Sequence, residues 1–161
     1  MADQLTVLQL VLDHLNLDGN ISTIDDRIAI QKAVCLTQEA GLQLGYGFNW
    51  YVRGPYSPSL TSDYYQIAGS RSAVEKDAQK FTLTASALRS LSKVQAVFNP
   101  PVGCPLGRVQ WLELLASVAF LVRRYQMSKE AAEEKIRISK PVLHPYFKKA
   151  YKALKDAEFL G

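Results

Sequence analysis

The residue types that carry most enzyme chemistry are few in this chain and lie far apart. The two histidines, His14 and His144, stand at opposite ends, and the two cysteines, Cys35 and Cys104, belong to separate segments. A nucleophile needs a base within reach, and a zinc site needs paired ligand spacing. No serine stands in a G-x-S-x-G stretch, and no glycine cluster leads into Gly-Lys-Ser or Gly-Lys-Thr. The sequence therefore predicts a protein that is not an enzyme and uses no metal or cofactor.

Aromatic residues gather instead in residues 46–65, which contain seven of the sixteen Phe, Trp and Tyr residues. Apolar and polar side chains alternate over residues 48–53, which is the period of a strand. Tyr51 and Arg53 are therefore expected on one face, with Trp50 on the other. Tyrosine and arginine supply much of the energy at binding hot spots, since they bury a large area and keep polar tips. The residues expected to bind a partner are Tyr51, Arg53, Tyr56, Tyr64 and Tyr65. Packing of the same rings against the preceding helix is the other interpretation, and both can apply to different rings.

Basic residues concentrate near the end of the chain. Residues 123–155 contain ten basic and three acidic side chains, a net charge of +7, whereas the whole chain carries +4. Such a segment can attract nucleic acid, an acidic protein or a phosphate-rich surface. The other interpretation is a solvated helix face. The lysines that would contact nucleic acid are Lys148, Lys149, Lys152 and Lys155.

Several helices must position these residues. Leucines at helical spacing predict a helix over residues 4–17, and Thr23 followed by Asp26 predicts a second one that ends at Gly41. After the strand of residues 48–53, Ser57 and Pro58 favour a short helix over residues 59–67.

The second half of the chain is also expected to be helical. Residues 69–80 are polar and predict a surface connection, and residues 81–84 predict an extended segment before a helix that Thr84 caps. Prolines and glycines at 99–107 indicate a hinge. Three further helices are expected: a buried one over residues 109–125, a polar one from Ser128 to about Ile138, and a last one after Pro141.

Together these patterns predict a mainly α fold. We expect one compact domain over residues 1–161, with about six to seven helices and a short β-hairpin or extended segments near residues 46–54 and 81–84. The hydrophobic share of 48% and the charged share of 21% are those of an ordinary globular protein. Two distant cysteines and the lack of a signal-like or membrane-spanning run favour the reducing cytoplasm.

Three stretches carry a resemblance to a known family: Arg27-Ile28-Ala29-Ile30-Gln31-Lys32, Tyr46-Gly47-Phe48-Asn49-Trp50-Tyr51, and Gly54-Pro55-Tyr56-Ser57-Pro58-Ser59-Leu60 with Asp63. They resemble the R-x-x-L-Q-K … W-Y-x-x-G-P-Y-S-x-x-L pattern of small bacterial and archaeal proteins of the YwgA type. More distantly, they are similar to the Panacea (SocA-like) antitoxin domain. The resemblance implies a mostly helical domain without catalytic residues that binds a partner protein and is commonly encoded beside toxin, prophage or defence genes.

Within this motif, a structural role is expected for Arg27, Gln31, Lys32, Gly54, Pro55, Ser57 and Asp63. Gln31 and Lys32 lie in the middle of the expected helix. From there, their amide and ammonium groups can reach the turn of residues 54–57 and satisfy its carbonyl groups. Such a contact is compatible with a structural role and equally with a functional one.

Two functions follow from these patterns. The first is a non-catalytic protein-interaction module, of an antitoxin-like or prophage and defence kind, that docks a partner through the aromatic Gly-Pro-Tyr-Ser turn. The alternative is a nucleic-acid-binding transcriptional regulator that uses the basic C-terminal helices.

Overall fold

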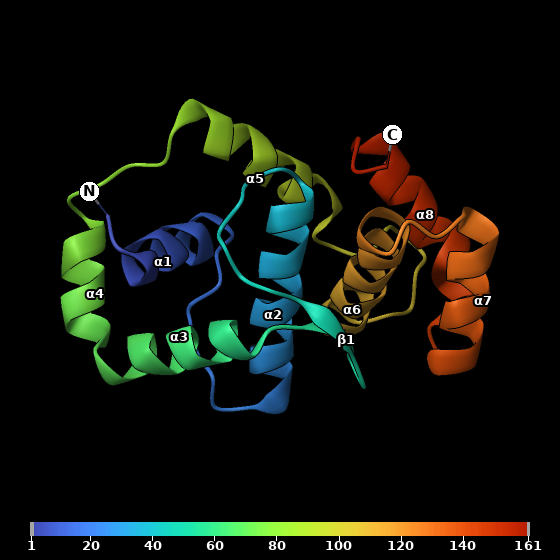
Figure 1. The fold of residues 1–161 in the computed structure, drawn as a ribbon, viewed down its shortest axis with the longest axis horizontal. Coiled ribbons are helices and arrows are strands. Elements are labelled where there is room, and N and C mark those ends of the chain that lie inside the picture. Colours follow the sequence, from blue (N-terminus) through green and yellow to red (C-terminus); the bar gives the residue numbers. More distant parts are fainter. Residues whose placement is uncertain (1, 161) are drawn as a thin grey trace.

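The protein is mainly helical. The computed structural model describes residues 2–160, which form eight α-helices, one π-helical turn, one 3-10 turn and a two-stranded antiparallel hairpin (Figure 1). In chain order the elements are α1 (Gln4–His14), α2 (Ile24–Glu39), β1 (Asn49–Tyr51), β2 (Gly54–Tyr56), α3 (Pro58–Gly69), α4 (Arg71–Ala78), α5 (Ala85–Val97), α6 (Arg108–Ala119), the π-helical turn (Phe120–Arg124), α7 (Lys129–Ser139), the 3-10 turn (His144–Tyr146) and α8 (Phe147–Asp156). The predicted mainly α class with one short hairpin is confirmed. Within the described range, no helix is both long enough and apolar enough to cross a membrane.

Helices α2 and α6 lie side by side at the centre of the molecule (Figure 1). Residues 28–39 of α2 are all buried, and α6 buries eight of its twelve residues. A helix that is apolar nearly all round must be covered on every side, so the buried helix predicted from residue 109 onward is confirmed. Helices α1, α3 and α4 lie beyond α2, and α7 and α8 lie beyond α6. One hydrophobic core includes side chains from both halves of the chain.

Side-chain caps begin several of these helices as predicted. Thr23 Oγ1 accepts the N–H of Asp26, and the Asp26 carboxylate accepts the N–H of Thr23, which makes a reciprocal capping box. Ser57, Thr84 and Ser128 each accept the N–H of the residue three positions on. These caps satisfy N–H groups that have no partner inside the helix, which is why they are readable in the sequence.

One prediction for the region between the hairpin and α5 is wrong. The predicted surface connection at residues 69–80 contains helix α4, whose Val74 and Ala78 are buried one turn apart, while α4 packs against α1. This single apolar pair in a polar stretch is too weak a pattern to reveal the helix. The extended segment predicted at residues 81–84 lies outside the sheet of β1 and β2, and Thr84 is extended where it caps α5, as predicted.

The hairpin and the end of α6 also differ from prediction. The strand predicted over residues 48–53 pairs only over Asn49–Tyr51, and Val52 lies in the turn with 92% of its surface exposed. The continuous helix predicted over residues 109–125 changes at Phe120 into a π-helical turn, where the N–H of Tyr125 reaches the carbonyl of Phe120.

At Gly54 the backbone of the hairpin comes close to α6. Its φ of +86° lies in the left-handed region, and a β-carbon there would lie 2.5 Å from Ser117 Oγ. That hydroxyl is buried and has no hydrogen-bond partner among residues 2–160. Gly45 has nearly the same φ, +85°, but open space at its β-carbon position. Alanine at either position therefore meets the same backbone strain, but only alanine at Gly54 also meets a steric clash.

We expect Gly54→Ala to destabilise the protein more than Gly45→Ala does. Left-handed strain costs about 1–2 kcal/mol at either site, and overpacking against Ser117 adds about 1–3 kcal/mol at Gly54 alone. The measurement is the free energy of unfolding from urea denaturation. The double variant Gly54→Ala/Ser117→Ala should return to the level of Gly45→Ala, because it removes the clashing oxygen. Equal losses for Gly54→Ala and Gly45→Ala would contradict the close approach.

Candidate functional site

A pocket of about 290 Å³ lies where α2, the hairpin and α3 meet. We call it the α2–α3 pocket. Its lining residues are Ile24, Arg27, Ile28, Gln31, Lys32, Arg53, Tyr56, Thr61, Tyr64 and Tyr65. The pocket thus brings together the helix part of the motif with four of the five residues predicted to bind a partner. The fifth, Tyr51, touches the pocket indirectly, because its ring packs edge-to-face on Tyr56 at 5.3 Å between centroids.

Gln31 connects α2 to the start of α3. Its Oε1 accepts the N–H of Ser57 at 2.9 Å, and its Nε2 donates to the carbonyl of Ser57 at 3.0 Å and to Thr61 Oγ1 at 3.0 Å. The amide therefore satisfies both backbone groups of Ser57, which is buried. A buried backbone group without a partner costs about 1–3 kcal/mol. This contact, predicted from the position of Gln31 in the helix, sets the angle at which the chain enters α3.

Lys32 stabilises the hairpin from the same helix. Its side chain is only 1% exposed, and its ammonium donates to the carbonyl of Pro55 at 2.7 Å, which is the second contact that the motif predicted. The pKa of Lys32 is lowered to about 8, chiefly by burial and to a smaller extent by the positive charges of Lys140 and Arg53. Glu113 and Cys35 act in the opposite direction.

A second buried lysine reaches the hairpin from the far side. Lys140, at the end of α7, donates to Glu113 Oε2 at 2.8 Å and to the carbonyl of Val52 at 3.3 Å, and its ammonium lies 5.5 Å from the centroid of the Trp50 ring. This residue belongs to the basic segment of the sequence, but it is buried and paired. Two lysines from different helices therefore bind carbonyl groups of one short hairpin.

The tyrosines of the site differ in exposure. Tyr51 is 46% exposed and Tyr65 is 51% exposed, whereas Tyr64 is 3% exposed and belongs to the core. Thr61 joins the inner hydroxyl groups, since its Oγ1 lies 2.6 Å from the Tyr56 hydroxyl and 3.3 Å from that of Tyr64. The exposed rings are thus available at the rim, while Tyr64 forms part of the pocket wall.

The remaining motif residues make contacts within the fold. Arg27 donates to the carbonyl of Ile21 at 2.8 Å, so one end of its guanidinium is fixed near the pocket rim. Asp63 accepts the Tyr46 hydroxyl at 2.7 Å and does not line the pocket. Burial, followed by the hydrogen bond to Asp63, raises the pKa of Tyr46.

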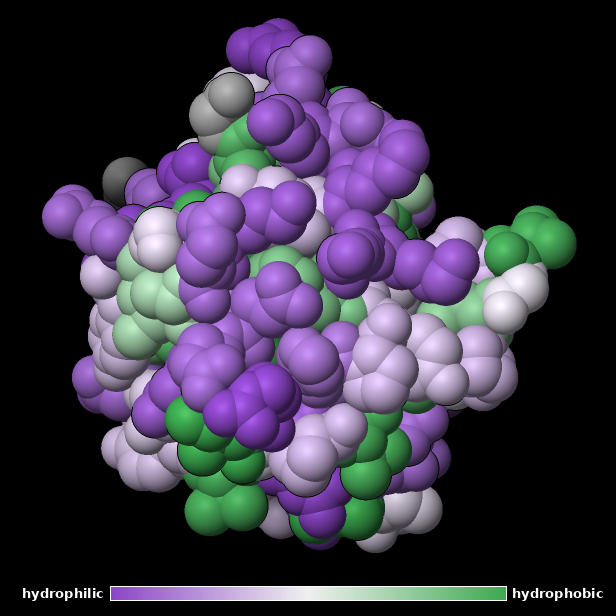
Figure 2. Space-filling view, turned by 90° about the vertical axis from the view of Figure 1, so that its right-hand side faces the viewer, coloured by the Kyte–Doolittle hydropathy of each residue, from purple (hydrophilic) through white to green (hydrophobic). Residues whose placement is uncertain are grey.

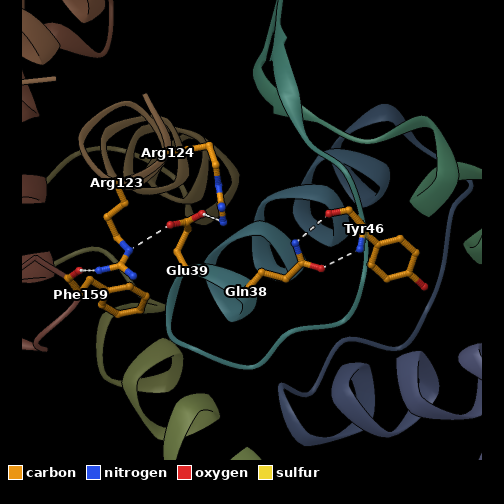
Figure 3. A network of polar contacts seen from close by, with 6 residues as sticks. All are labelled: Gln38, Glu39, Tyr46, Arg123, Arg124 and Phe159. Carbon is orange, nitrogen blue, oxygen red and sulfur yellow. Dashed lines mark hydrogen bonds and ion pairs between the residues drawn. The ribbon is translucent and has the colours of Figure 1, made fainter. Parts of the chain in front are cut away.

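A polar network at the other end of α2 was not found from the sequence. The buried carboxylate of Glu39 pairs with Arg123 at 3.0 Å and with Arg124 at 2.9 Å (Figure 3). Arg123 also donates to the carbonyl of Phe159, and Gln38 bonds both backbone groups of Tyr46. Both arginines stand in the π-helical turn. The one sign of this network in the sequence is Glu39, an acidic residue at the C-terminal end of the helix.

The basic residues predicted to contact nucleic acid lie on α8, which is on the far side of α6 from α3 (Figure 1). Lys148, Lys149, Lys152 and Lys155 are all exposed, as the amphipathic pattern predicted. Figure 2 shows this side of the molecule, where hydrophilic residues cover much of the surface. Lys152 pairs with Asp156, so three of the four lysines have no ion-pair partner in the part of the chain that the structure describes.

No family model, no curated protein and no solved structure matches this chain. The resemblance carried by residues 27–63 therefore stays a prediction. Across residues 2–160 there is also no group of three or more His, Cys, Asp or Glu side chains that could bind a metal ion.

The buried charge of Lys32 predicts a pH dependence of stability. The folded pKa is about 8, against an ordinary value of 10.5, so the unfolded chain binds more protons between these two pH values. The cost of burying the charge is fully present below pH 8 and is relieved as the pH rises. Relative to Lys32→Met, the wild-type free energy of unfolding should therefore increase by about 1 kcal/mol between pH 7 and pH 9.

Urea denaturation of both proteins at a series of pH values measures this difference. Cys35, whose thiol pKa is raised by burial, has the opposite effect, but both proteins contain it. An NMR titration of the Lys32 side chain serves as an independent check. Parallel pH profiles for the two proteins would contradict the assignment.

Proposed function

We propose that the protein is a non-catalytic interaction module that docks a partner protein through the rim of the α2–α3 pocket. The rim residues are Tyr51, Arg53, Tyr56 and Tyr65. The observation that carries the proposal is the combination of exposed tyrosine rings and an arginine around a small concave site, on a hairpin that two helices stabilise from below.

The size of the pocket favours a side chain of a partner over a cofactor. Pockets for small-molecule ligands usually measure about 300–1,000 Å³. At about 290 Å³, the α2–α3 pocket is at the lower limit of that range and suits one or two side chains. Hot spots at protein interfaces are enriched in Tyr and Arg, which are the residues at this rim.

Rigidity of the rim also supports the proposal. The hairpin is short, but Lys32 binds it at Pro55 and Lys140 binds it at Val52. A surface that is already ordered loses less conformational entropy on binding. The resemblance to YwgA-type proteins and to the Panacea antitoxin domain favours a toxin or another defence-system component as the partner. The two unpaired cysteines support a cytoplasmic location.

Capture of a partner tests this function. Tagged wild-type protein, Tyr56→Ala and Arg53→Ala are used to retrieve bound proteins from the native cell extract after nuclease treatment, and mass spectrometry identifies them. We expect a nuclease-resistant partner that is reduced at least tenfold in both variants, because each removes a rim contact. Arg89→Ala is the matched control, since Arg89 is an exposed arginine of α5, away from the site.

Circular dichroism and thermal melting establish that the variants remain folded. Retention of the same partner by both Tyr56→Ala and Arg53→Ala would show that the rim does not bind it.

The exposed lysines of α8 favour nucleic-acid binding as the second candidate function. Neutralising phosphates releases counterions, so the affinity should fall by about 0.9 log unit per log unit of salt for each phosphate contacted. The joint variant Lys148→Gln/Lys149→Gln/Lys155→Gln should then weaken binding to duplex DNA and reduce the salt slope, as measured by fluorescence anisotropy. Tyr56→Ala is the control that should leave DNA binding unchanged. Undetectable or salt-independent binding would remove this candidate.

A further inference from the structure

The α2–α3 pocket contains a concentration of cations without carboxylate partners. Three of its ten lining residues, Arg27, Lys32 and Arg53, are basic, and none is acidic. In the described part of the chain, no ion pair includes any of the three, although six other Lys and Arg residues do pair with carboxylates.

The hydrogen bonds that these cations do make leave much of their donor capacity unused. Arg27 and Lys32 each donate to one carbonyl oxygen, of Ile21 and of Pro55 respectively. A guanidinium has five N–H donors and an ammonium has three. The nearest acidic side chain in sequence, Asp26, is engaged in the capping box of α2. The charge of the pocket is therefore complementary to a negatively charged group.

Apart from Gln31 and Thr61, the other residues that line the pocket are isoleucines and tyrosines. Ile24 is half exposed at the start of α2, Ile28 lies one turn further on, and the rings of Tyr56 and Tyr65 close the opposite side. Large apolar side chains exposed beside a concave site are typical of interaction surfaces. A fully hydrophilic ligand such as a free phosphate would leave these walls without contacts.

We propose that the α2–α3 pocket binds an acidic peptide segment of the partner protein, in which a leucine or aromatic side chain enters the pocket and neighbouring carboxylates pair with Arg27 and Arg53. This inference rests on the proposed function and specifies the chemistry of the partner. Arg53 acts as the selecting residue at the rim, and the buried Lys32 contributes positive potential from the pocket floor.

Peptide selection tests the inference without knowledge of the partner. A display library of random twelve-residue peptides is selected against the full chain. We expect enrichment of sequences in which Asp or Glu flanks Leu, Phe or Trp. For the most enriched synthetic peptide, fluorescence anisotropy should show a dissociation constant that increases several-fold between 50 and 300 mM NaCl, because salt screens ion pairs at a surface.

Variants then locate the site and its charge preference. Arg53→Gln and Arg27→Gln should each weaken the peptide about tenfold, whereas Arg89→Gln on α5 should not change its affinity. Arg53→Glu should weaken the peptide further than Arg53→Gln does, because a carboxylate at the rim repels the acidic segment. A merely structural role for Arg53 would not make the loss depend on the charge of the substituted side chain.

Each other outcome counts against the inference. Enrichment of basic or purely apolar peptides, no enrichment at all, or equal binding to Arg53→Gln would overturn it, as would displacement of the peptide by duplex DNA. The proposed function is judged separately by the Tyr56- and Arg53-dependent capture of the natural partner. A captured partner together with a failed selection would thus leave the docking rim in place and reject only the acidic segment.

Discussion

The structure depends on how α2 satisfies buried backbone groups of the segment that follows it. Gly54, Pro55 and Ser57 of the turn are buried where β2 packs against α2 and α6, so water has little access to their carbonyl groups. Gln31 and Lys32, adjacent in the helix, donate to Ser57 and Pro55 and so replace that water. Removing the Gln31 amide would leave the buried N–H of Ser57 without its acceptor, and removing the Lys32 ammonium would leave the carbonyl of Pro55 without its donor. An unsatisfied buried group costs more than the hydrogen bond itself contributes. The Gln-Lys pair and the Gly-Pro-Tyr-Ser turn are therefore parts of one contact.

This contact explains why the aromatic segment is partly core and partly surface. Once the turn is fixed against α2, Tyr64 must point inward, while Tyr51 and Tyr65 remain at the rim. The same geometry places Arg27, Lys32 and Arg53 around one concavity without a carboxylate among its lining residues. Burying the charge of Lys32 there has an energetic cost, since its pKa is lowered mainly by burial and to a smaller extent by the positive charges of Lys140 and Arg53.

Local signals in the sequence were sufficient for much of this architecture. Caps at Thr23, Ser57, Thr84 and Ser128 are short-range contacts and could be read directly. Long-range ion pairs could not be predicted, because the partners lie far apart in the sequence and no regular spacing connects them. Examples are the pairs of Glu39 with Arg123 and Arg124, and the pair of Lys140 with Glu113. For that reason, the sequence indicated the pocket residues Gln31, Lys32 and Tyr56 but counted the buried Lys140 as part of a basic surface. Helix α4 was missed because tertiary contact with α1, and not its own pattern, stabilises it.

Because α6 covers one face of α2, the motif of residues 27–63 depends on parts of the chain that lie outside it. Residues 24–65 contain all the lining residues of the pocket, yet the hairpin also contacts Ser117 of α6 and Lys140 at the end of α7. An excised fragment would expose the face of α2 that α6 covers and would lack the second lysine. Grafting this recognition element onto another scaffold therefore requires a supporting helix with a small residue opposite Gly54. Divergence between related proteins should accordingly be slower on that face of α6 than on the solvent face of α8.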